Sequence, residues 1–393
     1  MIDKDNNIIE NCPKNNKIIE YDLNKTNNLK YTIKKDLNDE YNDMQEFLLM
    51  SYNHTLYNPN EIFYMSKNPK ISIVISVYNS EGFLKTALTS IQNQDFKDIE
   101  IIMIDDCSKD NSISLIKDLM KNDQRIILLQ NKENRGCLYT KAQGVLHAKA
   151  KYVMTLDSDD IYSQRDTFTT LFFEAEKNNL DILGFASIVS GINIKRGDYI
   201  HRYMETPVVF QPEILNFMYK NKNGYVKRVG DVIWNYFFKT ELFQKSIKQI
   251  DDKFFNIKMV YHDDFLFFFI LTRNAKSLRQ IKRVFYIMLS TPRKNNTIFQ
   301  IHDDIKEKYK DNLCSSYLNY VEFILNKTNN TIEDKRIASY ELNANFLDHE
   351  CRNNEVVQKE GINICKLFLQ NEYIENDIKD KIKLFLVEKN QNV

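Results

Sequence analysis

Three acidic residues follow directly on an apolar segment near the middle of the chain. Residues 152–157 read Tyr-Val-Met-Thr-Leu-Asp, and Ser158, Asp159 and Asp160 come next. An apolar run bounded by turn residues predicts a buried strand that ends at the acids. Because only the small Ser158 separates Asp157 from Asp159, both can direct oxygens at one divalent cation of the kind that prefers oxygen ligands. The same side chains can instead cap a following helix, since Ser and Asp accept hydrogen bonds from its first amides.

An alternation of strands and helices would position these acids. Segments rich in apolar and β-branched residues predict strands at 71–78, 99–104, 125–129, 152–157 and 180–187. Apolar residues at helical spacing predict helices at 83–91, 113–120, 138–146 and 168–175. This order favours an α/β fold with an open, mostly parallel sheet, flanked by helices and joined by right-handed crossovers. In such a sheet, ligands bind beyond the carboxyl ends of the strands.

Two further polar segments fall at strand ends. Residues 76–79 (Ser-Val-Tyr-Asn) end the first strand, and Asp105 and Asp106 end the second. We therefore expect both segments to lie near Asp157, although the two aspartates can equally cap the next helix and Tyr78 can be an ordinary core aromatic. The sequence has no glycine-rich phosphate loop after a strand, so a bound nucleotide would be held by side chains and a metal.

Composition narrows the class of protein. The chain has 393 residues, of which 43% are hydrophobic, and its 54 basic residues balance 54 acidic ones. Zero net charge argues against nucleic acid as the main partner. Residues 1–10 lack the apolar core of a signal peptide, and the apolar run 265–271 is too short to span a bilayer. The six cysteines form no C-x-x-C pair. These features predict a cytoplasmic protein without a transmembrane segment.

Taken together, the motifs from residue 71 to about 190 resemble a family 2 glycosyltransferase with the GT-A fold. The pieces that carry the resemblance are Val77-Tyr78-Asn79, residues 104–110 (Ile-Asp-Asp-Cys-Ser-Lys-Asp), Asn134-Arg135-Gly136 and residues 156–160 (Leu-Asp-Ser-Asp-Asp). Weaker matches follow at 231–235 (Asp-Val-Ile-Trp-Asn) and 261–265 (Tyr-His-Asp-Asp-Phe). The resemblance covers about half of the chain, and it is specific for the family but not for any one sugar.

The resemblance implies a nucleotide-sugar site. Ser76 and Tyr78 would line a uracil pocket, in which Tyr78 stacks or packs on the base. Asp106 would accept a hydrogen bond from the uracil ring NH, and Asp105 would support it. These roles imply a UDP-sugar as donor.

The same resemblance implies a metal site beside the diphosphate. Asp157 would lie by the ribose and the metal, with Ser158 next to it, and Asp159 would be the main carboxylate ligand of Mn²⁺ or Mg²⁺. Lys141 stands where the family usually has Arg. Lys keeps the positive charge but lacks the planar fork that grips a phosphate with two hydrogen bonds.

The acceptor side is implied by residues 262–264 (His-Asp-Asp), which stand where the family usually shows Glu-Asp. Sugar transfer needs a base for the acceptor hydroxyl, and we predict Asp264 in that role, with Asp263 holding the acceptor or the base. A neighbouring like charge would raise the pKa of the base. The pair can alternatively be acids that complement a helix dipole. His262 and Trp234 are predicted acceptor contacts, against the alternatives of an ordinary polar contact and a core aromatic.

We thus predict three segments: a polar, partly helical extension (1–66), a GT-A domain (67–296) and a helical C-terminal region (297–393) that could also serve a homodimer. The predicted activity is inverting, metal-dependent transfer from a UDP-sugar to a hydroxyl of a glycan, protein or lipid-linked acceptor. One alternative is a sugar-nucleotide- or glycan-binding protein without turnover, which the departures at Lys141 and Asp263 keep open. Another is a sugar-nucleotide nucleotidyltransferase, although its usual glycine-rich loop is missing.

Overall fold

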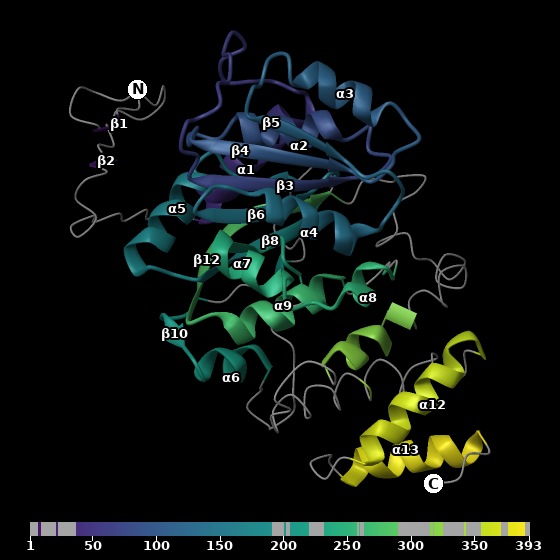
Figure 1. Ribbon diagram of the computed structural model, residues 1–393. Helices are drawn as coiled ribbons and strands as arrows, with labels where there is room; N and C mark the ends of the chain where they lie inside the picture. Colours follow the sequence, from purple (N-terminus) through teal and green to yellow (C-terminus); the bar gives the residue numbers. More distant parts are fainter. Residues whose placement is uncertain are drawn as a thin grey trace.

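Figure 1 shows the chain as a computed structural model, with a twisted sheet between layers of helices. The structure describes residues 7–8, 21–22, 37–190, 200–201, 205–219, 232–257, 259, 263–289, 315–316, 318–324, 342, 355–370 and 376–389. The predicted acceptor residue His262 lies outside the described residues, as does much of the predicted helical region after 297.

Four of the five predicted strands form at the expected places and are direct neighbours in the sheet. They are β3 (Ile71–Val77), β4 (Ile99–Asp105), β5 (Ile126–Gln130) and β6 (Tyr152–Asp157). They lie side by side in the order β6-β3-β4-β5 and all run parallel. Strands buried on both faces read as continuous apolar runs, which is why the sequence indicated them clearly.

The other half of the sheet is mixed. The fifth predicted strand is β8 (Ile182–Ser190), and it lies between β11 (Tyr236–Lys239) and β12 (Ser277–Leu289). The strand β11 runs antiparallel to both β6 and β8, whereas β12 is parallel to β8. Short antiparallel strands complete this half: β7 (Ile161–Tyr162), β9 (Ile200–His201) and β10 (Val209–Phe210). The sheet is therefore parallel on the side of the predicted nucleotide motifs and mixed beyond β6.

Helices cover both faces of the sheet. On one face, α2 (Leu84–Gln92), α3 (Ser112–Leu119) and α5 (Thr167–Asn178) share a core with Ile73 and Ile75 of β3. On the other face, α4 (Cys137–His147), α7 (Thr240–Ile247) and α9 (Asp263–Asn274) share a core with Val74. Side chains alternate between the faces along a strand, so Ser76 and Asp157 belong to the face that α4 and α9 cover.

A glycine sets how closely α4 approaches the sheet. A Cβ placed on Gly144 would come within 2.4 Å of both Ile104 Cδ1 and Val74 Cγ1. The helix can therefore lie nearly against β3 and β4 only because this position has no side chain. The close approach also brings Lys141, one turn earlier on α4, to the ends of the strands.

We expect Gly144→Ala to destabilise the protein by about 2 kcal/mol, because overpacking a tight core outweighs the gain in helix propensity. Denaturant unfolding would measure the change. The matched control is Gly82→Ala, since a Cβ on Gly82 meets nothing within 4 Å. An equal effect of the two substitutions would contradict the close-approach argument.

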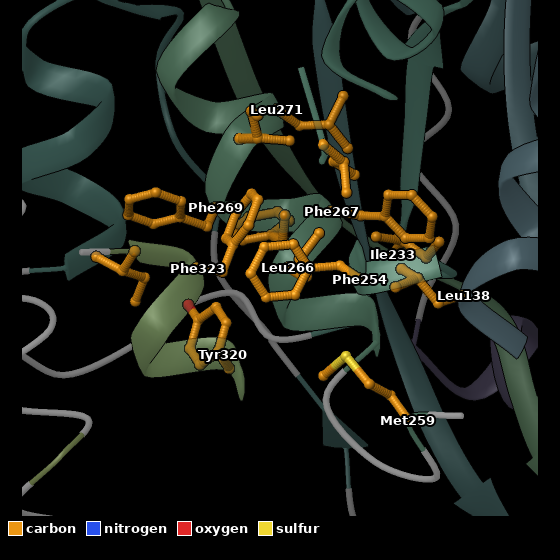
Figure 2. Close-up of a cluster of buried hydrophobic side chains, with 14 of the residues drawn as sticks. Leu138, Ile233, Phe254, Met259, Leu266, Phe267, Phe269, Leu271, Tyr320 and Phe323 are labelled. Atoms are coloured by element: carbon orange, nitrogen blue, oxygen red, sulfur yellow. The ribbon is translucent and has the colours of Figure 1, made fainter. Parts of the chain in front are cut away.

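The helix α9 is buried on several sides, which fixes the acids at its first turn. Phe268 packs on Tyr236 of β11 with ring centroids 4.8 Å apart, and Phe269 faces Phe323 from the C-terminal region at 6.2 Å. Figure 2 shows Phe269 and Leu266 beside Phe323 and Tyr320 in this cluster. Described parts of the C-terminal region thus share one apolar core with the sheet.

The N-terminal helix also packs on the sheet. Met44 and Leu48 of α1 (Leu37–Tyr52) are buried against β7, β8 and β12. The remaining elements are β1 (Asn7–Ile8), β2 (Tyr21–Asp22), α6 (Glu213–Tyr219), α8 (Asp252–Phe255), α12 (Glu355–Leu369) and α13 (Asn376–Glu388). Within the described ranges, no helix combines the length and apolarity that crossing a bilayer requires.

Candidate functional site

The predicted strand-end residues meet at one edge of the sheet. Ser76 of β3 pairs in register with Asp157 on β6 and with Ile104 on β4, and Val77 pairs with Asp105. The segments lie far apart in the sequence, but parallel pairing places their carboxyl ends side by side.

Lys141 joins this edge to the first turn of α9. Its Nζ donates to Asp264 Oδ1 at 2.9 Å and lies 3.5 Å from Asp263 Oδ2 and 3.4 Å from Asp157 Oδ1. The lysine is only 4% exposed. Burial alone would lower the pKa of Lys141, but the charges of Asp157 and Asp264 outweigh it and raise this pKa well above its ordinary value. The ammonium group therefore stays charged and holds carboxylates from a strand and a helix together.

The predicted base, Asp264, is buried beside this lysine. Burial raises the pKa of Asp264, Lys141 opposes the rise and Asp263 adds to it, with a result of about 7. A carboxyl group with a pKa near neutrality can accept a proton at physiological pH more readily than an ordinary aspartate. The predicted upward direction is therefore what the structure shows, with burial as the main cause instead of the neighbouring charge.

Asp106 accepts hydrogen bonds from the segment that starts α4. The amide nitrogens of Arg135 and Gly136 lie 2.8 Å from its Oδ1 and Oδ2, and Asn131 Nδ2 lies 2.8 Å from Oδ1. Gly136 adopts a φ of 85°, a conformation that favours glycine. Both amides precede Cys137, the first residue of α4, and the helix that follows Asp106 in the chain donates none of these bonds, so the contacts of Asp106 do not show the capping alternative. Such a carboxylate still has lone pairs for a ligand.

The other predicted uracil-pocket residues differ in exposure. Asp105 is buried and its Oδ2 accepts from the Ser108 amide at 3.1 Å, whereas Oδ1 has no hydrogen-bond partner among the described residues. Ser76 Oγ lies 3.8 Å from the sulfur of Cys137, at the start of α4. Tyr78 is 49% exposed, so its ring is available at the surface and is not a core aromatic.

The turn after β6 is anchored on two sides. Ser158 Oγ lies 2.7 Å from Ser80 Oγ, in the loop after β3. On the other side, Asp160 Oδ2 accepts from the hydroxyl of Tyr286 at 2.8 Å. Burial, and then the charges of Asp159 and Asp157, raise the pKa of Asp160 well above its ordinary value. Asp160 therefore belongs to the interior, whereas Asp157 lies at the strand end near Lys141.

The donor atoms at this turn fit a hard divalent cation. Asp157 and Asp159 offer carboxylate oxygens, and magnesium in particular is commonly held by one or two carboxylates plus waters and substrate phosphates. Among the residues that the structure describes, no group of three or more His, Cys, Asp or Glu side chains is arranged to hold a metal ion. Two carboxylates alone would thus make a site that depends on substrate oxygens for the remaining ligands.

The predicted acceptor residue Trp234 lies in the core. It is 3% exposed and its ring stacks on Tyr286 with centroids 4.5 Å apart. The core alternative accounts for this position, and an acceptor contact through the indole stays a prediction.

Sequence reasoning missed three residues of this region. Asp160 stood in the acidic run but received no role, Cys137 was considered only as one of six cysteines without a C-x-x-C pair, and Tyr286 was not considered. The signal for Asp160 was its adjacency to Asp159. Tyr286 lies inside the long strand β12, and nothing in its local sequence relates it to a turn more than a hundred residues earlier.

The sequence of this chain is similar to those of known glycosyltransferases. Residues 72–247 match the family described as glycosyl transferase family 2. The uncharacterized glycosyltransferase EpsJ of Bacillus subtilis (strain 168) is 28% identical over 225 residues, which are 57% of this chain and 62% of that protein. The GalNAc(5)-diNAcBac-PP-undecaprenol beta-1,3-glucosyltransferase of Campylobacter jejuni is 41% identical over 93 residues, 23% of this chain and 30% of that protein. The chain thus spans less than two thirds of either relative.

Solved structures share the fold. The crystal structure of S. aureus TarS residues 1–349 in complex with UDP-GlcNAc has a TM-score of 0.56 and 16% sequence identity, covering 82% of this chain and 92% of that one. The complex of the same TarS segment with UDP has a TM-score of 0.55 and 17% identity, covering 79% and 83%. The predicted α/β fold, an open sheet flanked by helices, is confirmed by this likeness.

Proposed function

We propose that this chain, whose residues 72–247 belong to glycosyl transferase family 2, transfers a sugar from a UDP-sugar to an acceptor hydroxyl with inversion at the anomeric carbon. One observation carries the proposal. Lys141 lies within 3.5 Å of Asp157, Asp263 and Asp264, so it unites the predicted donor edge with the predicted base. The burial of Asp264 beside Lys141, which leaves its pKa at about 7, favours a catalytic role over binding alone.

The donor would bind across the ends of β3, β4 and β6. The exposed ring of Tyr78, just after β3, offers a face for uracil, and Ser76 lies two residues earlier at the end of the same strand. Asp106 keeps acceptor capacity for the ring NH, and the unpartnered Oδ1 of Asp105 suits a supporting role. The TarS complexes with UDP and UDP-GlcNAc support UDP as the nucleotide.

The acceptor hydroxyl would be deprotonated by Asp264 as it attacks from the face opposite the diphosphate. The proton would move to Asp264, and the bond from the anomeric carbon to the diphosphate would break, which leaves UDP. Asp263, one residue before it and 3.5 Å from Lys141, would help to hold the base or the acceptor. A glycan or lipid-linked acceptor is supported by the undecaprenol-linked substrate in the name of the Campylobacter relative.

Asp159 and Asp157, with Ser158 between them, would hold Mn²⁺ or Mg²⁺ beside the diphosphate. When bound, such an ion supplies Lewis-acid stabilisation of the leaving group. Lys141, 3.4 Å from Asp157, would add a second positive charge near the phosphates.

Release of UDP from a panel of UDP-sugars, with Mn²⁺ and with EDTA, would test the function. We expect Asp159→Asn to weaken metal affinity, measured by calorimetry in the presence of UDP, by about tenfold to a hundredfold, since it removes one charged oxygen ligand. The matched control is Asp118→Asn, because Asp118 is an exposed acid that forms an ion pair with Lys121. Equal metal affinity in the two variants would contradict the ligand assignment, and UDP release unaffected by EDTA would contradict metal dependence.

A further inference from the structure

We propose that Tyr286 is a positioning residue for the metal-binding carboxylates, because its hydroxyl fixes the turn 157–160 that carries them. This role rests on the proposed function, since it presupposes that Asp157 and Asp159 bind a divalent cation. Tyr286 lies on β12, in the mixed half of the sheet, and neither the sequence motifs nor the family resemblance pointed to it.

One phenolic oxygen contacts both ends of the turn. Tyr286 Oη donates to Asp160 Oδ2 at 2.8 Å and accepts from the amide of Asp157 at 3.3 Å. The turn is closed by the amide of Asp160, which donates to the carbonyl of Asp157 at 3.0 Å. The second oxygen of Asp160 accepts from the amide of Leu289, the last residue of β12, at 3.0 Å. Strand β12 therefore holds Asp160, at the end of the turn, through two hydrogen bonds and Asp157, at its start, through one.

The amide of Asp157 needs such a partner because of the sheet order. Strand β6 lies between β3 and β11, but β11 pairs only with Tyr152 and Val153. Asp157 lies beyond the end of β11, so none of the strands that the structure describes supplies a main-chain acceptor on that side. A buried amide without a partner costs free energy. Tyr286 supplies the missing acceptor with a side chain.

The ring of Tyr286 is itself immobilised. It is fully buried, it stacks on Trp234 with centroids 4.5 Å apart, and it meets Tyr162 edge-on at 6.1 Å. Trp234 thus acquires a role as the support of Tyr286. On the opposite side of the turn, the contact between Ser158 and Ser80 at 2.7 Å holds the loop after β3. Asp159 is therefore carried by a turn that is fixed on both sides, as an outer shell orients metal ligands.

The test is Tyr286→Phe, which keeps the ring and removes only the hydroxyl. We expect the affinity for Mn²⁺, measured in the presence of UDP from the electron paramagnetic resonance signal of the unbound ion, to fall by about tenfold. The matched control is Tyr162→Phe, because Tyr162 is a buried neighbour whose hydroxyl donates to the carbonyl of Thr155 at 3.3 Å. Both variants should lose a similar few degrees in Tm, about 2–4 °C, but the control should bind Mn²⁺ as the wild type does.

A second variant guards against an effect of Tyr286→Phe on folding. Asp160→Asn keeps the size of the side chain, but its amide offers only one acceptor oxygen to the two donors, Tyr286 Oη and Leu289 N. It should weaken Mn²⁺ binding in the same direction.

The outcomes separate this role from the proposed function. Unchanged Mn²⁺ affinity in Tyr286→Phe, beside a wild type that binds the ion, would overturn the positioning role alone. Equal losses of Mn²⁺ affinity in Tyr286→Phe and Tyr162→Phe would also overturn it, because the weaker binding would then follow from the general loss of stability. Absence of Mn²⁺ binding in the wild-type protein would overturn the metal site and the positioning role together.

Discussion

Asp264→Asn should lower the turnover number by about 10²- to 10⁴-fold, the range that a general base contributes. The amide cannot accept the proton of the acceptor hydroxyl, but it has nearly the same shape as the carboxyl group. Donor binding should therefore persist, because the predicted donor contacts lie on β3, β4 and β6. Steady-state kinetics with a saturating acceptor, together with calorimetry of UDP binding, would measure both quantities.

The pH profile gives this prediction a second readout. Only the deprotonated form of Asp264 can act as base, and burial raises its pKa to about 7. In the wild-type protein, kcat/KM should therefore increase as the pH rises through about 7 and level off above it. The residual activity of Asp264→Asn should not show this increase of kcat/KM with pH.

The matched control is Asp263→Asn, the neighbouring acid on the same turn of α9. Asp263 is a more distant partner of Lys141, at 3.5 Å against 2.9 Å for Asp264, and we expect a smaller loss of turnover. A wild-type level of transfer in Asp264→Asn would show that the base has been assigned wrongly. A larger loss of turnover in Asp263→Asn than in Asp264→Asn would indicate that Asp263 is the base.

Lys141→Met should destabilise the protein by about 3 kcal/mol at pH 8, because breaking a buried ion pair leaves its partners uncompensated. Three carboxylates would then lie close together without a cation. Lys141 itself stays charged in this range, since its pKa is raised, so the pH dependence comes from the acids. Denaturant unfolding at several pH values would measure the effect.

The sign of the pH dependence follows from the acids. A carboxyl group whose pKa is raised by folding contributes stability that is present at low pH and is lost as the pH rises through the folded-state pKa. Without Lys141, whose charge opposes the rise, the pKa of Asp264 should rise further. The free energy of unfolding of Lys141→Met should therefore lie far below that of the wild type at pH 8, and the difference should become smaller toward pH 5.

Lys141→Arg is the control, because it keeps the positive charge. It should retain most of the stability that Lys141→Met loses, although its wider guanidinium must fit a buried position. A Lys141→Met protein as stable as the wild type at pH 8 would indicate that the three ion pairs make no net contribution.

Local signals in the sequence accounted for the first half of the fold. The runs that became β3, β4 and β6 are apolar on both faces, and both faces are indeed covered by helices. The second half was less readable. The strand β12 contains charged residues such as Arg279 and Arg283 among its apolar ones, and β11 is only four residues long. Neither gives the continuous apolar run by which a buried strand is recognised.

The same division holds for the site. The acids at 105–106 and 157–160 were visible because each interrupts an apolar run, and Asp264 was visible through the resemblance. The contact of Lys141 with Asp264 was not predictable, because 123 residues separate them. The supporting hydroxyl of Tyr286 was equally hidden inside a strand.

By itself, the sequence determined which residues lie at the ends of strands, because side-chain periodicity and turn residues act over a few positions. Only the tertiary structure decided which of these ends meet, and which cation and which hydroxyl hold them. That choice depends on close packing, such as the approach of α4 over Gly144 and the burial of α9 between β11 and Phe323. Packing of this kind is a property of surfaces brought together from distant segments, and no local pattern of residues encodes it.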